Sequence, residues 1–208
     1  MKKLDLKKDL KDLYNPSAKQ VSVVNVPKMN FLMIDGMGDP GTSQAYQDAL
    51  GALYGVAYTL KFMMKLKSKP AVDYPVMPPE GLWWVEGVEH FTMEQLMSRR
   101  DEWQWTMMIM QPDIITRERV AQAIDEVKRK KNPPSLDKIR FESLHEETCA
   151  QIMHMGPYAA EKPTIERLHA FILEGGHKLR GKHHEIYLGD PRRAKPEKLK
   201  TVLRQPMR

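Results

Sequence analysis

The chain has 208 residues, enough for one large domain or two small ones and for a sizeable hydrophobic core. Its single cysteine, Cys149, excludes an intramolecular disulfide and favours a reducing, cytoplasmic location. The sequence has no continuous apolar stretch typical of a signal peptide or a transmembrane helix, so we expect no membrane partner. A net charge of +6 is compatible with nucleic-acid binding, but the basic residues are spread over both ends and the stretch 128–131, and we expect no specific nucleic-acid partner.

The first elements along the chain are a predicted strand, a turn and a helix. Residues 21–34 are rich in β-branched and apolar residues, and the glycine cluster 36–41 ends the strand pattern. Apolar residues then recur every three or four positions from Ser43 onward, which predicts a helix. Either Thr42 or Ser43 is suited to cap its first turn.

Two strands are predicted next. The prolines between residues 70 and 79 exclude a helix there, and the aromatic segment 81–88 is typical of a short strand. The segment 103–110 alternates in the way expected of a second strand, which ends at Pro112.

The second half of the chain repeats this order. A capped apolar pattern predicts a helix over 116–131, followed by strands over 139–144 and 148–155. Another helix is predicted over 164–173 and a strand over 183–188.

The repeated order indicates an internal duplication. We expect a single α+β unit with a pseudo-twofold axis, because neither half alone is expected to bury its sheet face and helices. Residues 1–20 would be an N-terminal extension, and residues 21–208 would form the domain, with repeats of about 21–112 and 113–208. A groove at the axis is the natural place for a ligand.

Four tryptophans lie in or beside the predicted strands. Trp103 and Trp105 share one strand face with Met107, whereas Trp83 and Trp84 must point to opposite faces. Indole rings in the groove would offer flat walls to a planar ligand. The alternative is that these rings fill the core.

A carboxylate stands in the middle of the last predicted strand. Glu185 and Tyr187 share a face with His183, whereas His184 faces the other way. A glutamate here lies either on a solvated face or in a polar site that holds it for a purpose. The adjacent histidines point apart and no metal-ligand spacing is present, so we expect neither a metal nor another cofactor.

Several segments together resemble the GyrI-like family of small-molecule-binding proteins. They are IDGMGDPG at 34–41, EGLWW at 80–84, WQWTMMIMQPD at 103–113, HMGPY at 154–158 and HHEIYLGDPRR at 183–193. The resemblance covers nearly the whole chain. It implies an SHS2-type fold of two βαββ repeats with an antiparallel sheet, helices on one side and a ligand cleft between the repeats. This is also the fold of the effector-binding domains of multidrug-responsive regulators, whose DNA-binding helix-turn-helix is missing here.

The resemblance also implies a function. In similar domains a carboxylate among aromatic rings receives lipophilic ligands, and a stand-alone branch hydrolyses planar, cyclopropane-bearing, DNA-alkylating natural products, which detoxifies them. The matching residues here would be Glu185 as general base and Tyr158 as donor to the attacking water or to the ligand oxygen. Ligand contacts would come from Trp84, Trp103, Trp105, Met107 and Tyr187.

Two other functions fit the same residues. A non-catalytic binder or sensor of lipophilic cationic drugs would use Glu185 for charge complementarity and the rings for stacking. An interaction protein would act on gyrase or on nucleic acid through the basic ends of the chain. Residue patterns leave the oligomeric state open.

Overall fold

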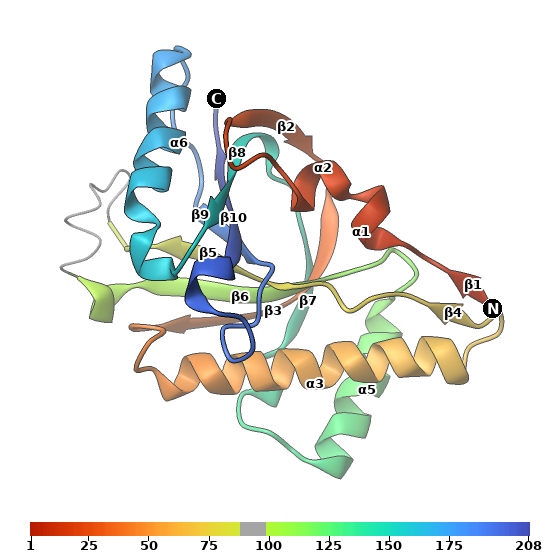
Figure 1. Cartoon of the computed structure of the whole chain (residues 1–208). Helices are drawn as coiled ribbons and strands as arrows, with labels where there is room; N and C mark the ends of the chain where they lie inside the picture. The colour runs from red at the N-terminus through yellow and green to blue at the C-terminus, as the bar shows by residue number, and fades with distance from the viewer. Residues whose placement is uncertain (88–98) are drawn as a thin grey trace.

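The computed structural model of the protein describes residues 1–87 and 99–208. Its centre is an eight-stranded sheet of order β2-β8-β10-β9-β5-β6-β3-β7, in which all neighbours are antiparallel (Figure 1). The strands are β2 (Ser22–Val26), β3 (Met29–Met37), β5 (Pro79–Trp84), β6 (Gln104–Gln111), β7 (Arg140–Leu144), β8 (Glu147–Met155), β9 (His183–Tyr187) and β10 (Lys200–Pro206). A separate parallel pair joins β1 (Lys2–Lys3) to β4 (Val72–Asp73).

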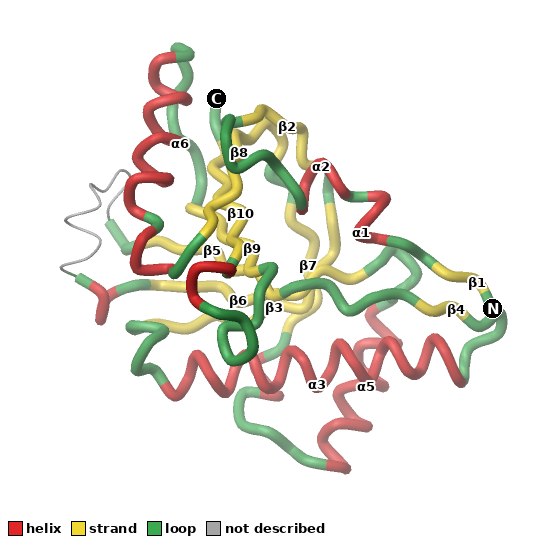
Figure 2. The backbone as a smooth tube through the Cα atoms, in the orientation of Figure 1, coloured by secondary structure: helices red, strands yellow, loops and turns green. Residues whose placement is uncertain are grey.

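Long helices cover one face of this sheet, and two short helices cover part of the other. The long helices are α3 (Gln44–Leu66), α5 (Arg117–Lys130) and α6 (Lys162–Glu174), and the short ones are α1 (Leu6–Asp9) and α2 (Lys11–Tyr14). Helices α3 and α6 pack on one face, and α5 packs against α3, where Val127 lies next to Gly55. The short N-terminal helices cover part of the other face (Figure 2). No helix among the described residues is long and apolar enough to cross a membrane.

Two βαββ units form this fold, as the duplicated pattern predicted. The first unit is β3-α3-β5-β6 and the second is β8-α6-β9-β10, and they meet where β5 pairs with β9. The strand before each unit crosses to the other unit, since β2 pairs with β8 and β7 pairs with β3. The α+β fold class is therefore confirmed. The boundary near residue 112 stays a prediction.

Matching turns align the two units residue by residue. Gly38 follows β3 and Gly156 follows β8, and both have positive φ (105° and 133°), where a side chain would be strained. The helix that follows begins after N-cap Ser43 in the first unit and after N-cap Glu161 in the second, the same distance along the chain.

Strand pairing carries this alignment across the sheet. Gly36 pairs with Trp105 in the first unit, and the equivalent His154 pairs with Thr201 in the second. Trp105 pairs in turn with Trp83, and Thr201 pairs with Tyr187. Two residues before these lie Gly81 and Glu185, which pair with each other. The resulting equivalent positions are Trp105 and Thr201, Trp83 and Tyr187, and Gly81 and Glu185.

A buried polar cluster ties the two units together on the face away from α3 and α6. His184 contacts Glu80 through Nε2 (2.9 Å) and Glu146 through Nδ1 (2.9 Å). Tyr14 donates to Glu80 (2.6 Å), and Arg204 donates to Glu146 (3.3 Å). The cluster therefore fastens β5, β9, β10 and the N-terminal segment in one place.

The charge of this cluster follows from its geometry. An imidazole flanked by two carboxylates must donate through both nitrogens, so His184 is an imidazolium. Burial alone would lower the pKa of His184, but Glu146 and Glu80 together raise it. With Arg204 as the second cation, two positive charges balance two carboxylates, as a buried cluster requires.

Candidate ligand-binding cavity

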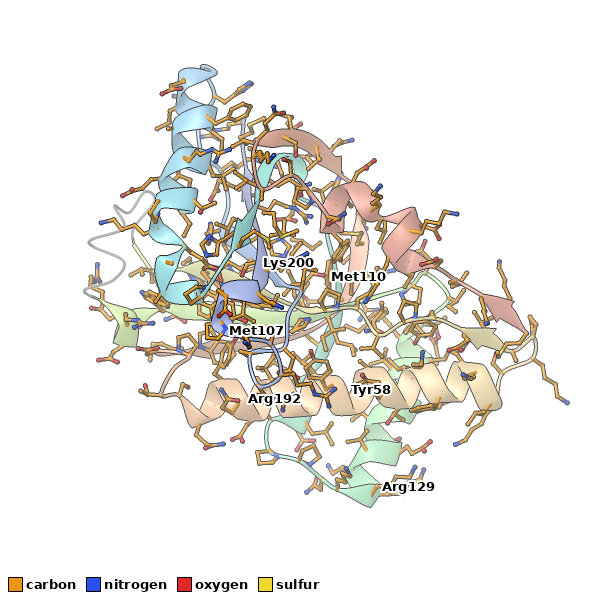
Figure 3. All side chains as sticks on the ribbon, in the orientation of Figure 1. Tyr58, Met107, Met110, Arg129, Arg192 and Lys200 are labelled. Atoms are coloured by element: carbon orange, nitrogen blue, oxygen red, sulfur yellow. The ribbon has the colours of Figure 1, made fainter. Side chains whose placement is uncertain are left out.

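A cavity of about 1570 Å³ lies over the junction of β5 and β9. Side chains from α3 and from the start of α6 form opposite walls, and residues of the loop between β9 and β10 line the mouth. Tyr58 on α3 and Arg192 on that loop, both labelled in Figure 3, are among the lining residues. The cavity thus lies at the pseudo-twofold axis, where the duplication predicted a groove.

Glu185 is held at the floor of this cavity by a chain of hydrogen bonds. The Tyr187 hydroxyl donates to Glu185 Oε2 (2.7 Å) and accepts from Trp83 Nε1 (2.9 Å). His183 Nε2 lies 3.3 Å from Glu185 Oε1, without the alignment of a hydrogen bond. The Glu185 side chain keeps 15% of its surface exposed, so its carboxylate is fixed in position and still reachable.

Gly81 makes this arrangement possible. It pairs directly with Glu185, and a Cβ there would lie 2.7 Å from Trp83 Nε1. Only glycine lets the indole lie flat over the strand at this point, where its N–H reaches the Tyr187 hydroxyl.

A second carboxyl, Glu161, lines the cavity at the start of α6. It is 5% exposed, and its Oε1 has no hydrogen-bond partner among the described residues. Burial first, and then the Glu185 carboxylate, raise the pKa of Glu161 to about 9. Both causes favour the protonated form of Glu161, which can donate a proton or a hydrogen bond.

Aromatic rings complete the walls. Trp83 packs edge-on against Trp103 (centroids 5.7 Å apart) and tilted against Tyr46 (6.1 Å). Tyr158 packs edge-on against Tyr187 (5.5 Å). Burial, together with Glu161 and Glu185, raises the pKa of Tyr158 to about 12, so its hydroxyl stays protonated and can donate.

The structure brings together only part of the set proposed from the sequence. Glu185, Tyr158, Tyr187 and Trp103 all line the cavity. Their roles in catalysis and binding remain predictions.

The other three expected ligand contacts are Trp84, at the border of the cavity, and Trp105 and Met107, in the core. Trp84 borders the cavity, but its ring packs on the opposite face of the sheet, with Lys182 Nζ 3.1 Å from the ring centre. Trp105 and Met107 do share a face with Trp103, but they are buried in the core beneath α3 (1% and 0% exposed). Trp103 differs because it precedes β6, at the open end of the strand.

Several lining residues were missed by reasoning from the sequence. They are Tyr46, Trp83, Glu161 and His183. Trp83 lies two residues after Gly81 and therefore faces the same side of β5. Gly81 pairs with Glu185, so Trp83 lies on the side of the sheet that carries Glu185, but this follows only when the pairing of β5 with β9 is known. Residues 1–87 and 99–208 contain no group of three or more histidine, cysteine, aspartate or glutamate side chains placed to hold a metal ion.

Comparisons with known proteins agree with this geometry. The family model of the GyrI-like small molecule binding domain matches residues 110–208. A crystal structure of an uncharacterized conserved protein from Listeria innocua is 38% identical, with a TM-score of 0.89, over 99% of this chain and 100% of that one. A hydrolase from the same organism is also 38% identical, with a TM-score of 0.87, over all of both chains.

More distant similarity concerns the fold alone. The C-terminal domain of EcmrR is 10% identical, with a TM-score of 0.55, over 91% of this chain and 97% of that one. A search of curated protein sequences found no match.

Proposed function

Since the chain belongs to the family of GyrI-like small-molecule-binding proteins, we propose that its cavity binds planar aromatic compounds and hydrolyses an activated cyclopropane in them. The observation that carries this proposal is the Glu185 carboxylate, fixed by Tyr187 and Trp83 at the floor of an aromatic cavity. The hydrolase from Listeria innocua, similar over its full length, supports a catalytic function. Ring opening would detoxify a DNA-alkylating compound, because it removes the electrophilic carbon.

The reaction needs a base and a site for developing negative charge. Glu185 takes a proton from water while the water oxygen forms a bond to the strained carbon. The carbon–carbon bond of the ring breaks, and its electron pair moves to the conjugated carbonyl oxygen, which becomes a phenolate. The phenolate then takes the proton from Glu185, so that one water is added overall. A well-placed base of this kind contributes ~10²–10⁴-fold.

Two hydroxyl donors stand near the base. Tyr158 packs on Tyr187, whose own hydroxyl is committed to Glu185. Tyr158 is thus available to hold the attacking water or the ligand oxygen. Trp83 and Trp103 would keep the ring system in one plane, so that water meets the strained carbon in line.

The test compares Glu185→Gln with the wild type on a cyclopropylpyrroloindole substrate. Ring-opened product is measured by chromatography and mass spectrometry, and binding by tryptophan quenching. We expect a loss of turnover of about 10²-fold or more with binding retained. Glu166→Gln, an exposed glutamate on α6, is the matched control and should keep wild-type turnover. Wild-type turnover by Glu185→Gln would contradict the assignment.

A second candidate function is binding without catalysis. Glu185 lies among aromatic rings, and a carboxylate in such a place also suits a lipophilic cation. Product analysis separates the two functions. Saturable quenching with no ring-opened product would favour a binder or sensor of cationic drugs.

A further inference from the structure

The two repeats place side chains of different polarity between the first strand and the helix of each unit. In the first repeat, the Trp105 indole lies over Gly36, where a Cβ would approach it to 2.1 Å, and against Tyr46 (5.5 Å). In the second repeat, Thr201 replaces that tryptophan and Glu161 takes the position of Ser43. Polar groups therefore occupy the place where the first repeat has an indole.

These polar groups are buried and incompletely satisfied. Glu161 Oε1 and His183 Nδ1 have no hydrogen-bond partner in the part of the chain that the structure describes, although both residues line the cavity. The Thr201 hydroxyl neighbours Glu161 without an aligned hydrogen bond. His154 differs from them, because its ring contacts Thr164 Oγ1 at 2.9 Å.

Buried polar atoms without partners are destabilising in a protein interior. A cavity that concentrates them is suited to a ligand group that forms the missing bonds. The rest of the wall is aromatic, so one end of a planar ligand would meet hydrogen-bonding groups while its body meets rings.

We propose that Glu161 and His183, with Thr201 beside them, form a polar subsite for an uncharged hydrogen-bonding group of the ligand, such as a carboxamide or a conjugated carbonyl. The Glu161 carboxyl can donate to the ligand oxygen, and the unpartnered His183 Nδ1 can donate to or accept from an amide, depending on the tautomer of the ring. A quaternary onium cation forms no conventional hydrogen bonds and would leave these atoms unsatisfied. A carboxylate would be repelled by Glu185.

This inference rests on the proposed function only in requiring that an aromatic ligand occupies the cavity. It does not depend on hydrolysis, so stable probes can test it. The probes are 2-naphthamide, its apolar isostere 2-isopropenylnaphthalene, and the trimethyl(2-naphthyl)ammonium cation. Isothermal titration calorimetry gives the affinity of each for the wild type and the variants.

We expect the wild type to bind 2-naphthamide about tenfold more tightly than the apolar isostere, as one net hydrogen bond allows. Glu161→Leu should abolish this preference. Glu161→Gln should keep it, since its amide still donates. Glu166→Leu, on the exposed side of α6, should leave all three affinities unchanged.

Three results would contradict the subsite. The first is an equal loss of affinity for all three probes in Glu161→Leu. The second is tighter binding of the cation than of the amide by the wild type, and the third is no saturable binding of any probe. If Glu161→Leu does not fold, His183→Phe on β9 tests the preference for 2-naphthamide over its apolar isostere instead. Absence of ring-opened product in the hydrolysis test would leave the subsite standing, so the two failures are distinguishable.

Discussion

The first repeat contributes tryptophans to the cavity and the second contributes both carboxyl groups, Glu161 and Glu185, although both repeats have the same βαββ backbone. The clearest contrast is Gly81 with Glu185, which are equivalent positions and also pair with each other across the axis. One has no side chain and the other has the carboxylate at the cavity floor. Where the first repeat has Trp83, the second has Tyr187, and these two are joined by a hydrogen bond.

This contrast shows how a duplicated fold acquires a single site. If both repeats carried the carboxylate, two like charges would meet at the axis and disfavour ionisation. If both carried glycine and tryptophan, the floor would be apolar. The asymmetric pair lets a rigid indole from one repeat orient the acid of the other.

The largest effect should come from making the first repeat resemble the second at Trp105. Trp105→Thr copies the equivalent Thr201 and removes an indole that is 1% exposed. We expect the free energy of unfolding to fall by about 3–5 kcal/mol, as for other large-to-small changes in a core. Urea unfolding followed by circular dichroism measures it. Trp103→Thr, at the cavity wall, should lose much less stability, and equal losses would contradict the contrast.

The same contrast explains which parts of the site were visible in the sequence. Periodicity predicted most strands and helices, because apolar residues there follow the burial of one face. Glu185 and Tyr187 were placed together because they alternate on one strand. Alternation does not predict which residues on one face of a strand are covered by a helix. Tyr46 of α3 covers Trp105, whereas Trp103 on the same face is only partly covered.

Strand β10 was missed for a physical reason. Its sequence contains Lys200, Arg204 and Pro206, which are unusual in a central strand. Arg204 is fully buried, yet Glu146 and Gln151 satisfy it from neighbouring elements. Such compensation depends on contacts between residues far apart in the chain, so local pattern could not reveal it.

A smaller effect is expected where the two repeats touch at the axis. Gly81→Ala would place a methyl group 2.7 Å from Trp83 Nε1 and push the indole away from Tyr187. We expect a loss of about 1–3 kcal/mol in stability, the cost of overpacking, together with weaker ligand binding. Gly55→Ala is the control, because Gly55 lies outside the cavity lining and a Cβ there would make only an ordinary contact with Val127, at 3.7 Å. Unchanged binding by Gly81→Ala would separate the Trp83–Tyr187 bond from ligand recognition.

The raised pKa of Glu161 should make the free energy of unfolding depend on pH. Glu161 has a pKa of about 9 in the folded protein, raised above its ordinary value by burial and by Glu185. The unfolded chain releases this proton near pH 4.5, so the stabilising contribution is full below that pH and is lost as the pH rises towards 9. Glu161→Gln cannot ionise. Between pH 5 and 9, the wild type should therefore lose more of its free energy of unfolding than this variant. Parallel pH profiles would contradict a neutral Glu161.

The smallest effect concerns the residue equivalent to Glu161. Ser43 caps α3, since its hydroxyl accepts from Tyr46 N (3.3 Å), whereas Glu161 forms no such bond at the start of α6. Ser43→Ala should lower the free energy of unfolding by about 1 kcal/mol, the usual value of a cap. It should leave the affinity for 2-naphthamide unchanged. Glu161→Ser, which copies the first repeat, should lose the preference for the amide over its apolar isostere. If both changes altered only stability, then Glu161 would be a helix terminus like Ser43, and the two repeats would not differ in function at this position.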